Sequence, residues 1–197
     1  MTPRSHSLRR VSLPAATGMA SLLGVLGLLA GAPAQAFEVK SPSLGTEQRL
    51  TQEQVFAGFG CEGGNRSPAL TWSAPPAGTQ SLAVTVHDPD APTGSGWWHW
   101  VVYNLPPQTT QLPANAGRAD GQGLPPGTVQ GRTDYGTTGF GGACPPVGDA
   151  PHRYRFTVHA LKVPRLDLPA DASPALVGYM LHMNRLASTT LEARYGR

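Results

Sequence analysis

The clearest pattern along the chain is a set of short segments rich in β-branched and aromatic residues, each bounded by Pro, Gly or Asp. Segments of this kind favour β-strands, in which successive side chains point to opposite faces of a sheet. They cover residues 69–72, 82–87, 98–105 and 154–161. The pattern therefore predicts a β core.

The hydrophobic period changes near the end of the sequence. Ser173 can act as an N-cap, and Pro174 suits the first position of a helix. The residues that then follow i, i+3, i+4 spacing are Leu176, Val177, Met180, Leu181, Asn184, Ala187 and Leu191. This spacing predicts one C-terminal helix that closes the domain.

The first 36 residues have the features of a bacterial export signal. A basic stretch with Arg9 and Arg10 precedes an apolar stretch at 19–29, and small residues follow at Ala34 and Ala36. About 11 apolar residues are too few for a membrane span, which needs about 20. We expect cleavage after Ala36, no permanent membrane anchor, and a periplasmic or secreted protein. The Sec and Tat routes both remain open.

We expect residues 37–197 to form one domain, because they contain no linker, no repeat and no charged block. The longest irregular stretch is 106–144, where Pro, Gly, Thr and Asp outnumber apolar residues. Loops of this length in a compact domain are often functional.

The charge distribution argues against a nucleic-acid partner. The 197 residues include 15 Lys or Arg and 12 Asp or Glu, and three of the basic residues lie in the leader. The expected mature domain is therefore formally neutral. It has no run of basic residues interleaved with aromatics, which nucleic-acid binding requires.

Export also affects how the two cysteines, Cys61 and Cys144, are interpreted. An oxidising compartment lets thiols pair, and neither cysteine lies in a C-x-x-C motif. We expect a Cys61–Cys144 disulfide. His87, Asp88, Asp90 and His99 could be considered as metal ligands, but His87 and Asp88 point to opposite faces of a continuous strand. No metal and no cofactor are expected.

Several motifs in order resemble one known family. They are Cys61-Glu62-Gly63-Gly64-Asn65-Arg66-Ser67-Pro68, Leu70-Thr71-Trp72, Asp88-Pro89-Asp90-Ala91-Pro92, Trp97-Trp98-His99-Trp100, Gly141-Gly142-Ala143-Cys144-Pro145-Pro146 and His152-Arg153-Tyr154. Together they resemble the phosphatidylethanolamine-binding protein family, in its bacterial Raf-kinase-inhibitor-like branch. The resemblance covers most of residues 37–197.

This resemblance implies a mainly β fold of two antiparallel sheets with long loops, and a small pocket that binds anions such as phosphate or phosphoryl head groups. By matching motif positions, the pocket is expected to use Asp88, His99, His152 and Tyr154. The residues expected to frame it are Pro92, Trp97, Gly142, Pro145 and Pro146.

The residue chemistry is compatible with an anion site. Strict alternation places His99 on the face of Val101 and Tyr103, while His152 and Tyr154 share a face on another strand. Imidazole and phenol groups can donate to phosphate oxygens, and backbone N–H groups of the Gly-rich loop 139–143 can add more. Asp88 is expected to hold a histidine tautomer or to raise its pKa. Taken singly, each of these residues is also common in purely structural roles.

The sequence contains neither a G-x-S-x-G motif nor a Walker lysine, so a binding protein is favoured over an enzyme. Two alternatives remain open: a phosphoester hydrolase that uses His99 and His152, and an inhibitor of a kinase or protease. A homodimer also remains open. His159 and His182 are interpreted as structural.

Overall fold

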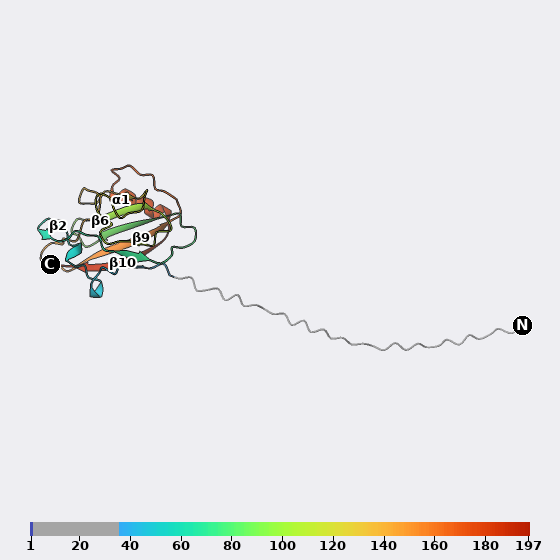
Figure 1. Cartoon of the computed structure of the whole chain (residues 1–197), viewed down its shortest axis with the longest axis horizontal. Helices are drawn as coiled ribbons and strands as arrows, with labels where there is room; N and C mark the ends of the chain where they lie inside the picture. Colours follow the sequence, from blue (N-terminus) through green and yellow to red (C-terminus); the bar gives the residue numbers. More distant parts are fainter. Residues whose placement is uncertain (2–35) are drawn as a thin grey trace. The chain divides into compact units, whose positions relative to one another are not determined.

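The computed structural model describes Met1 and residues 36–197 (Figure 1). The expected signal peptide, residues 1–36, falls largely on positions 2–35 and so lies outside the described residues. The domain that follows is built mainly of antiparallel strands, as the sequence predicts.

Two main sheets make up the domain. The larger has the strand order β10-β9-β5-β6-β8, the smaller has the order β1-β4-β7, and β2 and β3 form a short hairpin. The strand bounds are β1 Val39–Lys40, β2 Ala57–Gly58, β3 Cys61–Glu62, β4 Leu70–Trp72, β5 Ser81–Asp88, β6 Trp97–Leu105, β7 Gln111–Leu112, β8 Val129–Gln130, β9 His152–Leu161 and β10 Arg185–Tyr195. The helical elements are η1 Thr46–Gln48, η2 Gln52–Gln54 and α1 Pro174–Asn184.

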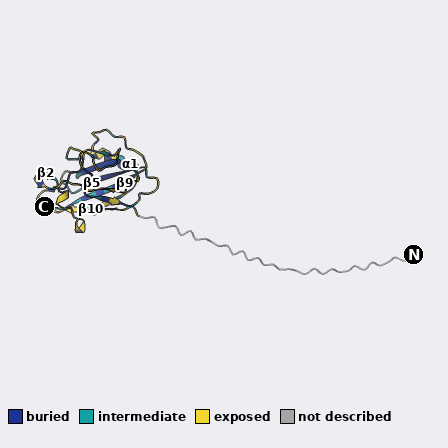
Figure 2. Ribbon diagram, viewed as in Figure 1, coloured by how far each residue is buried: buried dark blue, intermediate teal, exposed yellow. Residues whose placement is uncertain are grey.

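The core has two parts, one on each face of the five-stranded sheet, whose strands are mostly coloured as buried in Figure 2. One cluster lies toward the smaller sheet and includes Trp72, Trp100 and Phe156. The other includes Val177 and Leu181 of α1. The central strand β5 is buried along nearly its whole length because its two faces are both covered. The loops carry most of the exposed residues.

The C-terminal helix is shorter than the sequence predicts. Ser173 caps it by accepting a hydrogen bond from Leu176 N–H, but the helix ends at Asn184. The predicted continuation through Ala187 and Leu191 is wrong, because residues 185–195 form β10 and pair with β9. Ala187 and Leu191 pack against the core from that strand. Their spacing of four fits a strand face as well as a helix face.

A β-bulge changes the direction of His99. Val86 of β5 lies opposite Trp100, but the next residue, His87, lies opposite Trp98, so β6 carries one extra residue at this point. The His99 ring packs on Tyr154, at 5.2 Å between ring centroids. The expectation that His99 shares a face with Val101 and Tyr103 is therefore wrong. A bulge breaks strict alternation, and here it turns the imidazole toward β9.

The predicted disulfide is confirmed. Cys61 and Cys144 are bonded, with their Cα atoms 5.9 Å apart. The bond ties the β2–β3 hairpin to the loop that begins at Pro145. These two loops then form adjoining parts of one cavity wall.

Candidate functional site

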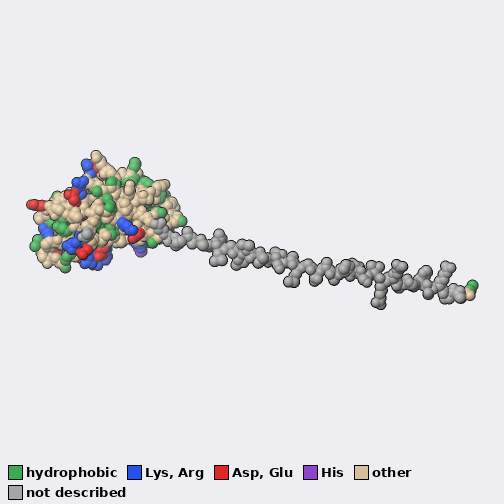
Figure 3. Space-filling view, turned by 60° about the horizontal axis from the view of Figure 1, so that its bottom comes forward, with side chains coloured by type: hydrophobic (Ala, Val, Ile, Leu, Met, Phe, Trp, Pro, Cys, Tyr) green, Lys and Arg blue, Asp and Glu red, His purple; other side chains and the backbone are tan. Residues whose placement is uncertain are grey.

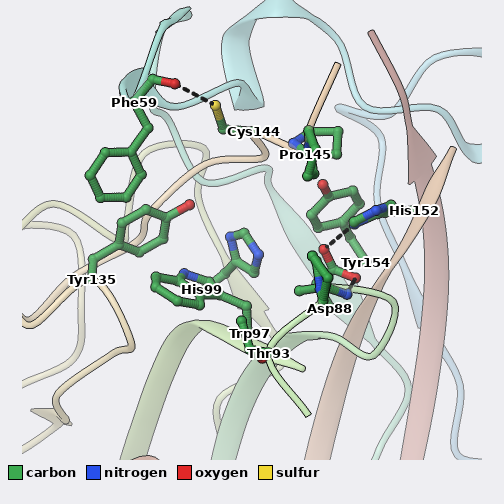
Figure 4. Close-up of a pocket in the computed structure, with 13 residues that line it drawn as sticks. Phe59, Asp88, Thr93, Trp97, His99, Tyr135, Cys144, Pro145, His152 and Tyr154 are labelled. Atoms are coloured by element: carbon green, nitrogen blue, oxygen red, sulfur yellow. Dashed lines mark hydrogen bonds and ion pairs between the residues drawn. The ribbon is translucent and has the colours of Figure 1, made fainter. Parts of the chain in front are cut away.

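A cavity of about 170 Å³ lies where the end of β5 and the starts of β6 and β9 meet (Figure 4). Loops that carry Pro92, Tyr135 and Pro145 complete its walls. The residues that line it are Phe59, Asp88, Ala91, Pro92, Thr93, Trp97, His99, Tyr135, Cys144, Pro145, Pro146, His152 and Tyr154. The surface is mainly aromatic and proline-rich, with a few polar groups.

Eight of the nine residues expected at the pocket line this cavity, and Gly142 does not. The lining residues missed by the sequence analysis are Phe59, Ala91, Thr93, Tyr135 and Cys144. Tyr135 lies in the long irregular stretch, where no periodic pattern indicates which way a side chain points. Ala91 and Thr93 adjoin Pro92, which was expected. Phe59 stands at the turn between β2 and β3.

Asp88 and His152 form a buried pair on the cavity wall. His152 Nδ1 lies 2.7 Å from Asp88 Oδ2, and both side chains are almost fully buried. Asp88 Oδ1 accepts hydrogen bonds from the N–H groups of Asp90 and Ala91, which fixes the carboxylate. His152 Nε2 lies 3.3 Å from Asp149 Oδ2. The expected contact of Asp88 with a histidine is thus made to His152.

The pKa of His152 is the balance of opposing effects. Burial lowers it, but the hydrogen bonds and negative charges of Asp88 and Asp149 outweigh burial, so the net pKa is raised. The raised pKa favours an imidazolium that donates from both nitrogens to the flanking carboxylates. The protonated form is therefore favoured over a wider pH range than in a free histidine, and both ring nitrogens already face carboxylate acceptors.

The pKa of His99, in contrast to that of His152, is lowered. Burial lowers its pKa to about 4, only partly offset by the Gly141 carbonyl and the Asp88 charge, so the ring is neutral near pH 7. Nδ1 lies 2.8 Å from the Gly141 carbonyl oxygen, so Nδ1 carries the proton and donates. Nε2 is then an acceptor, and it is buried without a hydrogen-bond partner among the described residues. An imidazolium at His99 is not the form expected near neutral pH.

Two tyrosines flank the His99 ring (Figure 4). The Tyr135 hydroxyl donates to the Gly142 carbonyl oxygen at 2.7 Å. Tyr154 makes no side-chain hydrogen bond with another residue in 36–197 and lines the cavity. Burial raises the pKa of both phenols, so both remain protonated donors. The indole N–H of Trp97 is buried and likewise without a partner in the described part of the chain.

Four of the five backbone N–H groups of the Gly-rich loop 139–143 are already hydrogen-bonded. The N–H groups of residues 140–143 bond to the oxygens of Gly117, His99, Asn65 and Gln54 respectively. These four groups are therefore engaged within the chain and are not free to donate to an anion. Gly142 has a packing role instead: a Cβ there would meet the Gln54 carbonyl oxygen at 2.4 Å and the Phe56 nitrogen at 2.5 Å. Only glycine fits this close approach of two backbones.

The side chains once considered as metal ligands are engaged elsewhere. Asp90 accepts from the Arg153 guanidinium, with Nε to Oδ2 at 2.9 Å, and this pairing lowers the Asp90 pKa to about 2. His87 Nε2 lies 3.1 Å from the Ser95 carbonyl oxygen. Among the described residues no group of three or more His, Cys, Asp or Glu side chains could hold a metal ion.

Comparison with known proteins shows the family of this chain. Residues 41–196 match the family model for phosphatidylethanolamine-binding protein. The chain belongs to this family. Among its relatives, the UPF0098 protein YbcL of Escherichia coli is 58% identical over 164 residues, covering 83% of this chain and 90% of YbcL. The UPF0098 protein YbhB of the same species is 51% identical over 147 residues, covering 75% of this chain and 92% of YbhB.

Solved structures of the phosphatidylethanolamine-binding protein family agree with the fold. The crystal structure of E. coli YbcL superimposes with a TM-score of 0.79 and 57% identity, covering 82% of this chain and 98% of the other. A homologue from Chlamydia trachomatis gives a TM-score of 0.68 at 28% identity, with 83% and 99% covered.

Another relative of this chain is named as a lipoprotein. A putative lipoprotein, LppC of Mycobacterium tuberculosis, is 42% identical over 115 residues, covering 58% of this chain and 52% of LppC. None of the helices in the described residues has the length and apolar character needed to cross a bilayer.

Proposed function

We propose that this member of the phosphatidylethanolamine-binding protein family binds a small anion or phosphoryl-bearing ligand in the cavity, without chemical turnover. The observation that carries the proposal is the pair of unpartnered buried polar atoms in the cavity wall, His99 Nε2 and Trp97 Nε1. Buried polar groups in folded proteins are nearly always hydrogen-bonded, so unpaired ones indicate a missing partner.

A phosphoryl group suits this set of atoms. Tyr154 O–H and Trp97 N–H are donors for its oxygens, and neutral His99 Nε2 can accept from a protonated P–OH group. His152 lies in the same wall with a raised pKa, and its protonated form offsets the negative charge of Asp88 toward an incoming anion. The cavity, at about 170 Å³, has room for such a group and a few attached atoms.

The lining offers no activated nucleophile, which supports binding over hydrolysis. Cys144 is oxidised in the disulfide. The Thr93 hydroxyl donates to the Gly96 carbonyl oxygen, so its proton is already engaged. The two tyrosines have raised pKa values and so remain protonated. Purified protein is expected to leave phosphomonoesters intact.

The proposal includes an extracytoplasmic location. A disulfide persists in oxidising compartments, and a relative is named as a lipoprotein. The sequence of the first 36 residues is consistent with export. Intact mass spectrometry of protein from the exported fraction is expected to show a chain that begins at Phe37. A species that retains residues 1–36 would contradict the cleavage.

Calorimetric titration with inorganic phosphate tests the binding site. Tyr154→Phe removes one donor without changing shape, and we expect binding to weaken by about ten- to a hundredfold, since a hydrogen bond to a charged group contributes about 1.5–3 kcal/mol. Asp88→Asn should also weaken binding, because the His152 imidazolium loses its strongest partner. Simple repulsion between the Asp88 carboxylate and the anion predicts tighter binding in Asp88→Asn instead.

The affinity for phosphate should fall as pH rises through the raised pKa of His152.

Tyr179→Phe is the matched control, since Tyr179 is exposed on α1 and is not among the residues that line the cavity. Its affinity should equal that of the wild type. Equal affinity in Tyr154→Phe would remove the site assignment. Tighter binding in Asp88→Asn would show that Asp88 acts on the ligand by repulsion and not through His152.

A further inference from the structure

The side chain of Arg197 connects the two segments that the disulfide joins. Its Nε donates to the Pro145 carbonyl oxygen at 2.6 Å, and its Nη1 donates to the Gly60 carbonyl oxygen at 3.0 Å. Gly60 directly precedes Cys61, and Pro145 directly follows Cys144. The guanidinium therefore bridges the backbone beside both sulfur atoms. In Figure 1 the C-terminus accordingly lies beside β2.

These two segments form the mouth of the cavity, which we define as Phe59, Pro145 and Pro146. All three residues line the cavity, and Figure 4 shows Phe59 and Pro145 on either side of Cys144. Phe59 is 71% exposed and has a φ of 53°, a left-handed conformation that a bulky residue rarely adopts. Such a conformation persists only where neighbouring contacts hold it. The mouth therefore depends on the ties between its two sides.

Few ties hold the two sides together at the mouth itself. The Phe56 N–H donates to the Ala143 carbonyl oxygen at 2.9 Å, but this bond lies before Cys144. Cys144 Sγ lies 3.6 Å from the Phe59 carbonyl oxygen, although a sulfur in a disulfide has no proton to donate. From Cys144 onward, the ties to the hairpin recorded for residues 36–197 are the disulfide and the Arg197 guanidinium.

The main chain next to the guanidinium is held against the same loop. The Arg197 main-chain oxygen accepts from Gly148 N–H at 3.3 Å. A Cβ at Gly196 would lie only 3.1 Å from Pro151 Cα, so the two backbones run close together there. These contacts anchor the base of the Arg197 side chain. A guanidinium is a planar fork of N–H donors, so it can bond two carbonyl oxygens in a fixed geometry.

We propose that Arg197 is a positioning residue for the cavity mouth, which holds the β2–β3 hairpin against the Pro145 loop at the separation that the disulfide requires. Contacts that keep two cysteines together favour the bonded form over two separate thiols, and this coupling is reciprocal. Arg197 thus makes the disulfide harder to reduce. It also keeps the mouth closed around the polar atoms of the cavity once the bond is reduced. This second role rests on the proposed ligand site.

Equilibration with mixtures of reduced and oxidised dithiothreitol measures the first role. Cys61 and Cys144 gain two electrons and two protons in this exchange, while dithiothreitol loses them as it closes its own disulfide. Arg197→Ala should shift the equilibrium about tenfold toward the thiols, which is about 30 mV for a two-electron couple. Arg197→Lys should not restore the wild-type value, because an ammonium lacks the planar fork. Alkylation of free thiols followed by intact mass spectrometry counts the reduced fraction.

Arg194→Ala is the matched control, since it removes the same charge three residues earlier. The Arg194 side chain is exposed and lies 3.5 Å from Glu192 Oε1. Figure 3 shows basic and acidic side chains interspersed on the face that it presents, so the loss of one Arg does not break up a large basic patch there. The Arg194→Ala equilibrium should equal that of the wild type. An unchanged equilibrium in Arg197→Ala, or an equal shift in Arg194→Ala, would overturn the proposal.

Calorimetric titration with inorganic phosphate, in the oxidised and the reduced state, measures the second role. Reduction of the wild type should change the affinity by no more than about twofold, because Arg197 still holds the mouth. Reduction of Arg197→Ala should weaken binding at least about tenfold, because losing both ties lets water reach the donors, and the two losses are not additive. Circular dichroism checks that each reduced sample is folded.

The two proposals fail in different ways. If reduction has the same effect on phosphate binding in the wild type and in Arg197→Ala, the second role of Arg197 is wrong. If the oxidised wild type does not bind phosphate, the proposed function is wrong, and the dithiothreitol equilibrium still decides whether Arg197 positions the mouth.

Discussion

Replacing both cysteines, as Cys61→Ala with Cys144→Ala, is expected to lower the free energy of unfolding by up to about 4.5 kcal/mol, from the entropy of the chain segment that the bond closes. The bond joins residues separated by 83 positions. For a domain of this size, such a loss corresponds to a fall of roughly 10 °C in Tm.

Urea denaturation of the oxidised wild type, the reduced wild type and the double variant measures this effect. The last two should agree, because both lack the bond and differ only in the two sulfur atoms. If the oxidised and reduced proteins unfold at the same urea concentration, the bond contributes nothing to stability. The cavity wall formed by Phe59 and Cys144 should then also be unaffected by reduction.

Acidification from pH 7 to pH 4 is expected to destabilise the fold by about 3 kcal/mol for each of two buried histidines. Burial lowers the pKa of His99 and of His159 to about 4. An unfolded histidine, with a pKa near its ordinary value of about 6.5, binds protons in this window that the folded state does not. The free energy of unfolding therefore falls as pH falls.

His152 has the opposite sign and a different window. Its folded pKa is raised, so its contribution to the free energy of unfolding is complete below about pH 6.5 and is lost as pH rises through the folded pKa.

The free energy of unfolding, measured at pH 7 and at pH 4, should fall less on acidification in His159→Gln than in the wild type. His182→Gln is the control, because His182 is exposed on α1. An unchanged difference in His159→Gln would contradict the buried neutral form of that ring.

The strands and most of the cavity could be predicted from the sequence because they depend on local signals. The β-rich segments and the motifs around Asp88, His99 and His152 mark three chain positions that the sheet brings together. The direction of His99 could not be predicted, since it depends on one extra residue in β6 that only pairing with β5 reveals.

Two other features depend on contacts between distant parts of the chain, which local sequence patterns do not show. The segment 185–195 follows helical spacing, and pairing with β9 decides that it forms a strand. Gly142 stands in a recognisable motif, but its role is set by the approach of Gln54 and Phe56, which lie more than 80 residues earlier. Sequence motifs indicate which residues gather; they do not indicate which atoms remain free.

The order of strands in the larger sheet also constrains how the chain can fold. β5 lies between β6, which follows it closely, and β9, which begins more than 60 residues later at His152. A growing chain that ends before residue 152 can form the β5–β6 hairpin but leaves the other edge of β5 bare. Such long-range pairing is intrinsically slow and exposes apolar strands to aggregation. Both the cavity and the complete sheet need β9, so neither can form before residues 152–161 are available.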